Sequence, residues 1–214
     1  MKDNTPSNRD FLEKASFALI ALQLAVFAKM WMDLGLDRAT DDFPVLVMCT
    51  ALFAASQRKL AARPPNRGAG RWLFASRAAA LAMLTFGTLT IGYYRLVPGA
   101  APAPELAASC LFALMWVIIT LKGAGIGKLK PGSAMGLCVP WTKQSRLAWD
   151  RAHRTLGRVL FWGGLIGLAT SLVVNPLVTV ALWFITVALA VSTALFESWR
   201  TWRIDPERRG GHAA

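Results

Sequence analysis

The sequence predicts an all-α protein, a polytopic membrane helix bundle of about six transmembrane helices with both termini in the cytoplasm. Three observations predict this fold class. Hydrophobic residues make up 55% of the 214 residues, and the mean hydropathy is +0.41. Long apolar segments follow one another along the chain, and basic residues gather in alternate connections between them. A soluble domain of this size rarely reaches such a hydropathy, because polar side chains must cover its surface.

Six apolar segments are candidates for the spans, since a helix that crosses about 30 Å of hydrocarbon needs roughly 20 apolar residues. They are residues 15–32, 43–57, 74–96, 104–121, 157–174 and 177–197. The second segment is short, and it spans if Arg58 and Lys59 extend towards the headgroups. Asn175-Pro176 joins the last two segments in a tight helical hairpin.

Charge orients these segments. Nearly all of the 24 lysines and arginines lie in the N-terminus, in residues 58–77, in residues 122–158 and in the C-terminus. Acidic residues instead crowd the first alternate connection, at Asp33, Asp37, Asp41 and Asp42. The excess of cations in cytoplasmic connections therefore predicts that both termini are cytoplasmic. It also makes a bilayer with anionic headgroups the expected partner.

The segments divide the chain into four regions. Residues 1–121 form an N-terminal four-helix membrane region, 122–156 a cytoplasmic loop with an amphipathic helix, 157–199 a C-terminal transmembrane hairpin and 200–214 a basic cytoplasmic tail. Connections rich in Pro and Gly are expected at 62–71, 98–104 and 122–135, and a disordered tail is expected at 205–214.

Composition argues against several functions. The apolar segments exclude a simple nucleic-acid binder despite the net charge of +12. The three cysteines and two histidines lack metal-ligand spacing, so no metal site, disulfide framework or cofactor is predicted. Cys138 is expected to be a small buried side chain. The spans hold no paired carboxylates and no histidine, so the sequence predicts no catalytic residues and no enzyme.

The loop before the fifth segment carries most of the polar chemistry. Pro140-Trp141-Thr142 interrupts the chain, and Thr142 or Ser145 is expected to cap the helix that follows. That helix is basic and amphipathic, and it runs into the fifth span at Gly157. Asp150 and Arg154 lie on it at a spacing that favours an ion pair.

Polar, glycine and aromatic residues recur through this loop in a fixed order. They are Lys130-Pro131, Gly136, Pro140-Trp141-Thr142, Ser145, Trp149, His153-Arg154, Gly157 and Gly164. In order and spacing, this set resembles the signature of the SdpI family of bacterial multi-pass membrane proteins. The chain departs from that signature at Cys138 and Val139, where Arg and Thr are usual, and at Gly132, where Asn is common.

The resemblance implies an inner-membrane protein that confers immunity to a membrane-active peptide toxin, or senses one, with signalling that holds a cytoplasmic repressor at the membrane. The toxin and the repressor are the partners it implies. We expect the binding or signalling loop to comprise Pro140, Trp141, Thr142, Ser145, Trp149, Asp150, His153, Arg154 and Gly157. Alternatives are a membrane-embedded lipid-modifying enzyme or small transporter, and a partner subunit of a membrane complex.

Several of these residues have two interpretations. Trp141 and Trp149 either recognise a ligand or anchor the chain at headgroup level. His153 either titrates as a switch, or bonds Asp150 or a backbone carbonyl and fixes the loop. Gly163 and Gly167 have the spacing of a helix-packing motif, which also arises by chance in apolar segments.

Overall fold

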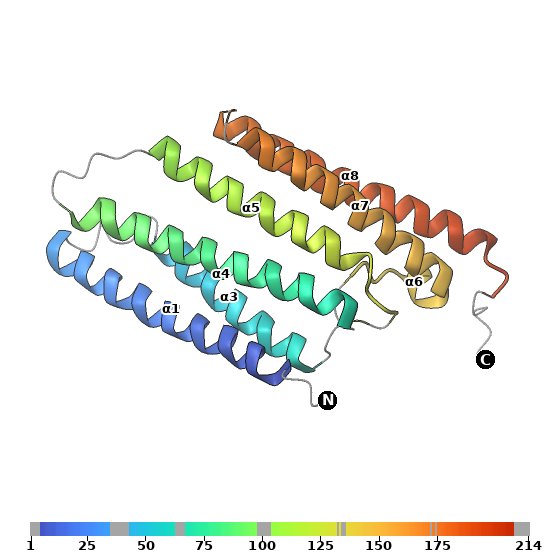
Figure 1. The fold of residues 1–214 in the computed structure, drawn as a ribbon, viewed down its shortest axis with the longest axis horizontal. Coiled ribbons are helices and arrows are strands. Elements are labelled where there is room, and N and C mark those ends of the chain that lie inside the picture. The colour runs from blue at the N-terminus through green and yellow to red at the C-terminus, as the bar shows by residue number, and fades with distance from the viewer. Residues whose placement is uncertain are drawn as a thin grey trace. The chain divides into compact units, whose positions relative to one another are not determined.

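The computed structural model describes residues 5–34, 43–62, 67–97, 104–131, 133, 136–171, 173 and 175–207. Over these residues the protein is all-helical, which confirms the predicted fold class (Figure 1). The helices are α1 (Thr5–Leu34), α3 (Phe43–Ala62), α4 (Arg67–Leu96), α5 (Pro104–Ile126), α6 (Pro140–Gln144), α7 (Arg146–Ser171) and α8 (Pro176–Ile204).

Four of these helices contain stretches long and apolar enough to cross a membrane. The stretches are Phe11–Asp33, Ala69–Leu96, Leu106–Ile126 and Pro176–Ile204. The second predicted span lies in α3, whose apolar part is Leu46–Ala55. The fifth lies in α7, where arginines in the first half and glycines in the second lower the hydropathy. The chain is therefore a multi-pass helical membrane protein.

Two predicted connections are shorter than expected. The 62–71 connection was expected to be irregular, but α4 begins at Arg67, and α5 continues to Ile126 into the stretch expected to be flexible. Packing explains the extension of α5. Gly123 and Gly125 lie against α7 and the start of α4, so tertiary contact offsets the low helix propensity of glycine. Several predicted features lie outside the described residues. They are positions 63–66, 98–103 and 208–214, and the aspartates Asp37, Asp41 and Asp42.

The helices form two compact units, and α4 and α5 each contribute to both. The first unit comprises Met1–Ala62 and Arg77–Leu111. Its apolar core is centred on Met30, against which Val26, Phe27, Val47 and Ile91 pack.

A polar contact lies within this first unit. The Gln23 amide is buried and donates to the hydroxyls of Thr50 (2.9 Å) and Thr88 (3.0 Å). Each threonine hydroxyl donates in turn to the carbonyl four residues earlier on its own helix, at Leu46 and Leu84. The amide therefore connects α1 to α3 and α4, as polar side chains do between membrane helices.

The second unit comprises Arg63–Ser76 and Phe112–Ala214. Its centre is the hairpin of α7 and α8, which run side by side in opposite directions (Figure 1). Asn175 begins α8: its side-chain oxygen accepts a hydrogen bond from Leu177 N–H at 2.8 Å, and Pro176 takes the first helical position. The predicted hairpin is therefore present, and the short helix α6 packs against both of its arms.

Glycines allow α5 to approach α7 within this unit. A Cβ at Gly157 would lie 2.8 Å from the Gly123 carbonyl oxygen, and one at Gly164 would lie 2.3 Å from the Thr120 hydroxyl. Gly167 gives room to the Trp116 indole, whereas Gly163 faces Thr186 of α8. Gly163 and Gly167 therefore both serve helix packing, but each faces a different helix.

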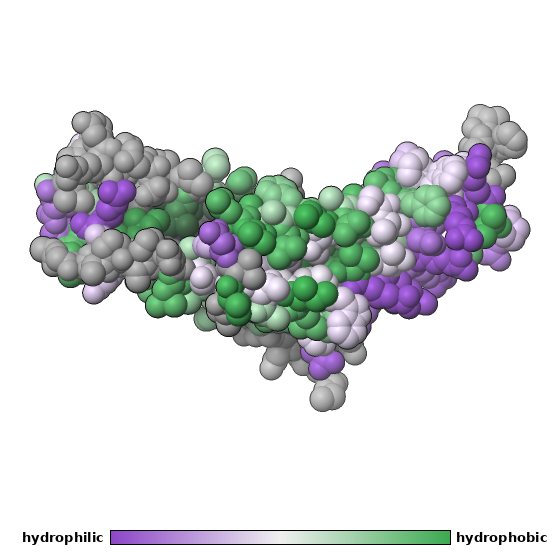
Figure 2. All heavy atoms as spheres, turned by 90° about the horizontal axis from the view of Figure 1, so that it is seen from above, coloured by the Kyte–Doolittle hydropathy of each residue, from purple (hydrophilic) through white to green (hydrophobic). Residues whose placement is uncertain are grey.

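The surface of the second unit is divided between apolar and polar parts. Large apolar side chains are exposed along α7 and α8, including Trp162, Ile166, Phe184 and Phe196. Figure 2 shows hydrophilic residues gathered where α7 begins and α8 ends, beside a broad hydrophobic area. This distribution suits a hairpin whose middle lies in hydrocarbon and whose arginine-rich end lies at the headgroups.

The contact between α5 and α7 yields a prediction. Gly164→Ala should destabilise the protein by about 1–3 kcal/mol, because the new Cβ meets the Thr120 backbone and cannot rotate away. Gly70→Ala is the matched control: nothing lies within 4 Å of the added Cβ, so this helical substitution should be neutral or stabilising. Thermal unfolding in detergent micelles measures both. Equal effects would contradict the close approach.

Candidate functional site

The central loop turns back over the imidazole of His153. Leu137 N–H donates to His153 Nε2 at 3.0 Å, and His153 Nδ1 lies 2.8 Å from the Trp149 carbonyl oxygen. Because Nε2 accepts, the proton of the neutral ring is on Nδ1 and is donated to that carbonyl. Gly136 makes this turn with a φ of 129°, and a Cβ there would lie 2.1 Å from Nε2. Only glycine fits both conditions.

Trp149 forms the other wall of the imidazole site. The two rings stack with centroids 4.0 Å apart and an interplanar angle of 22°. The indole Nε1–H donates to the Leu129 carbonyl at 3.1 Å, so this tryptophan also holds the beginning of the loop. Both side chains are buried, at 2% exposure for Trp149 and 1% for His153.

Thr142 closes the turn that leads into α6. Its hydroxyl donates to the carbonyls of Leu137 (2.8 Å) and Val139 (2.9 Å) and accepts from Val139 N–H at 3.1 Å. Pro140 occupies the first position of α6, where its missing N–H costs nothing. The Pro-Trp-Thr sequence thus forms a compact helical turn.

Ser145 separates α6 from α7 and connects them to α8. Its hydroxyl accepts from Ala148 N–H at 2.9 Å, which confirms the predicted N-cap, and donates to the Asp205 carboxylate after the end of α8. Two further bonds reach α8. Trp141 Nε1–H donates to the Ser198 hydroxyl at 2.7 Å, and Trp202 Nε1–H donates to Gln144 Oε1 at 3.0 Å.

The structure brings most of the predicted loop residues into one hydrogen-bonded network. Within it lie Trp141, Thr142, Ser145, Trp149 and His153, and Pro140 begins the short helix α6 that belongs to it. Gly157 follows at the contact with α5. For His153, the geometry favours the interpretation in which it bonds a backbone carbonyl and fixes the loop.

Two expectations for this region were wrong. Asp150 and Arg154 form no ion pair with each other, although their spacing on α7 allows one. The Arg154 side chain is instead exposed, because α7 turns its outward face away from the loop. Cys138 is exposed rather than buried, because the Leu137 and Val139 backbone is what the network engages.

Sequence reasoning missed the partners on α8. Ser198 and Asp205 lie 57 and 60 residues from the residues they bond, so no local pattern pointed to them. Gln144 and the Leu129 carbonyl were also missed. The sequence held one signal for the end of α8. Ser198 precedes Trp199 and Asp205 follows Trp202, and such polar residues at the end of a span are unusual in positions that face only lipid.

The site has few groups free for chemistry. Both ring nitrogens of His153 are engaged, and among the described residues no three His, Cys, Asp or Glu side chains are placed to hold a metal ion. Burial lowers the pKa of His153 below its ordinary value of 6.5, against smaller raising effects of the Trp149 carbonyl and the Asp150 charge. The imidazole is therefore neutral at pH 7.

Fold and loop together define the class of protein: a multi-pass helical membrane protein with an ordered loop fastened across its last two helices. Residues 128–196 match the model of the SdpI/YfhL protein family, which confirms the resemblance predicted from the loop residues. The match begins at Lys128, includes α6 and α7, and ends within α8. No curated protein and no solved structure matched the chain.

The neutral His153 yields a prediction for pH. The folded-state pKa lies below 6.5, so the unfolded chain binds the proton more tightly. The stabilisation is complete above about pH 6.5 and is lost as the pH falls through the folded-state pKa. Unfolding temperatures measured in detergent should therefore fall on acidification more steeply for the wild type than for His153→Gln. Parallel curves would contradict the assignment.

Proposed function

We propose that this protein resides in a bacterial inner membrane, with both termini in the cytoplasm, and that it confers immunity to a membrane-active peptide toxin or senses one. In this proposal the spans or outer connections engage the peptide, and the central loop passes the state of α7 and α8 to the cytoplasm. A cytoplasmic repressor is the partner that the family resemblance implies for that step. The protein acts without enzymatic chemistry.

The hydrogen-bonded network of the loop is the observation that carries this proposal. Within the described part of residues 129–145, the signature residues Trp149, His153, Ser145 and Trp141 form hydrogen bonds that hold the loop to α7 and α8. A displacement of α8 relative to α7 moves Ser198 and Asp205 together and must disturb these bonds. Such a network suits a transmitting element better than a catalytic centre, which needs a free acid, base or nucleophile.

The outer side of the loop is available to a partner. Lys143, Arg146 and Leu147 are exposed, and together with Gln144 and Glu207 they border a depression of about 590 Å³. Asp205, which accepts the hydrogen bond from Ser145, lines this depression. A partner bound there would therefore respond to the bond that couples the loop to α8.

A protection assay tests the proposal. The chain is expressed in a toxin-sensitive bacterium, which is challenged with secreted membrane-active peptides. Wild type should protect, and Trp141→Phe should protect less, because it loses only the bond to Ser198, worth about 1 kcal/mol. Trp199→Ala is the control, since Trp199 lies beside Ser198 on α8 but is exposed and does not bond the loop.

All variants are compared at equal membrane levels. Absence of protection by a correctly inserted wild type would refute immunity and favour a partner subunit. Protection that Trp141→Phe leaves intact would keep immunity but remove the loop from the mechanism.

The orientation gives a separate prediction. Cys138 is exposed in the loop, whereas Cys49 and Cys110 lie in apolar helices α3 and α5. A membrane-impermeant maleimide should therefore label inside-out vesicles at Cys138 and leave right-side-out vesicles unlabelled. Cys138→Ser should abolish the labelling. Labelling of right-side-out vesicles instead would invert the proposed topology.

A further inference from the structure

The outward face of α7 changes character along its length. Arg151, Arg154 and Arg158 follow one another at helical spacing and are exposed. Trp162 and Ile166 continue the same face and are 63% and 62% exposed. One side of a single helix is therefore cationic in its first half and apolar in its second.

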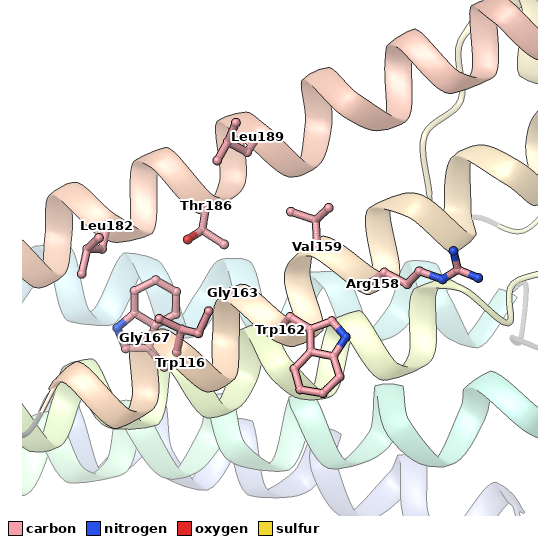
Figure 3. Close-up of a pocket in the computed structure, with 10 residues that line it drawn as sticks. Trp116, Arg158, Val159, Trp162, Gly163, Gly167, Leu182, Thr186 and Leu189 are labelled. Atoms are coloured by element: carbon pink, nitrogen blue, oxygen red, sulfur yellow. The ribbon is translucent and has the colours of Figure 1, made fainter.

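The apolar half borders a groove. Figure 3 shows Leu182, Thr186 and Leu189 of α8 facing α7 across this space, with Trp116 of α5 on its inner side. The groove has a volume of about 420 Å³, within the range of small-molecule sites, and its lining is almost wholly apolar. It stays open because Gly163 and Gly167 contribute no side chain to fill it.

The cationic half borders a second, polar depression of about 370 Å³. Arg151, Arg154 and Arg158 line it, and Glu197 of α8 is the carboxylate that faces them. None of the three guanidinium groups forms an ion pair with a described residue. Three cations against one carboxylate leave an uncompensated positive charge in this depression.

Arg158 lines both spaces. Figure 3 places it at one end of the apolar groove, with its guanidinium directed away from Leu182 and Thr186. A ligand that fits both spaces must have an anionic group and an apolar chain attached to it.

We propose that this face is a binding site for one anionic phospholipid. The phosphate is held by Arg154 and Arg158, and one acyl chain lies in the groove along Trp162 and Ile166. The lengths agree: Arg158 and Ile166 are separated by about 12 Å of helix, close to the roughly 15 Å of one leaflet's hydrocarbon. Arg158 also stands at the beginning of the predicted fifth span, where headgroup phosphates lie.

Native mass spectrometry of the full chain in detergent tests this site. The probes are phosphatidylglycerol, phosphatidylcholine with the same acyl chains, and glycerol phosphate, which has the anion without a chain. The wild type should retain phosphatidylglycerol and neither of the other two. Arg154→Gln with Arg158→Gln should reduce retention at least about fivefold, since each cation near a phosphate contributes about that factor. Lysine at both positions should restore most of it.

Matched variants separate the site from general charge and hydrophobicity. Arg146→Gln with Arg200→Gln removes the same charge from exposed positions outside both spaces and should leave retention unchanged. Trp162→Ala should weaken retention, whereas Phe184→Ala, an equally exposed aromatic residue outside the groove, should not.

Equal retention by wild type and the Arg154/Arg158 glutamine variant would overturn the proposal. So would equal retention of phosphatidylcholine, or tight binding of glycerol phosphate, which would leave the groove unused. A groove that retains an apolar peptide in preference to phosphatidylglycerol would overturn it in favour of a peptide site. The protection assay does not depend on these outcomes.

Discussion

The order of the central loop depends on the hydrogen bond from Leu137 N–H to the imidazole of His153. Gly136 must adopt a positive φ, and have no Cβ, for the backbone to reach the ring. Once the chain is placed there, the Leu137 carbonyl meets Thr142, the turn leads into α6, and Ser145 is positioned to begin α7 and reach Asp205. The rest of the network follows from where the imidazole lies.

Close helix approach imposes a second constraint, and it accounts for the low hydropathy of α7. Gly157, Gly164 and Gly167 bring α5 against α7, at contacts that a single methyl group would block. Hydrocarbon gives no hydrophobic drive between helices, so tight van der Waals contact must supply the association. This is why α7, which packs against both α5 and α8, is not among the four helices that carry stretches apolar enough to cross a membrane.

The sequence predicted features that depend on local pattern and missed those that depend on distant contacts. Apolar length located the long helices, four of which carry stretches apolar enough to cross a membrane. Of the two caps that the sequence offered, Thr142 and Ser145, the structure shows Ser145. The extension of α5 past Lys122 was missed because its glycines are held by α7, not by their own propensity. The contacts of the loop with Ser198 and Asp205 join residues nearly 60 positions apart. His153 was left with two interpretations, because the partners of its ring nitrogens are set by the tertiary fold of the loop.

The two faces of α7 carry different kinds of interaction. The inner face uses neutral groups at short distances, where burial makes each hydrogen bond specific. The outer face keeps its arginines exposed, and they form no ion pair with any described residue, so their charge acts on whatever surrounds the protein. In a helix built this way, the cations of the outer face fix its depth in the bilayer, while the inner face holds the loop. A lipid phosphate bound to Arg154 would thus act one residue from His153, on the helix that orders the loop.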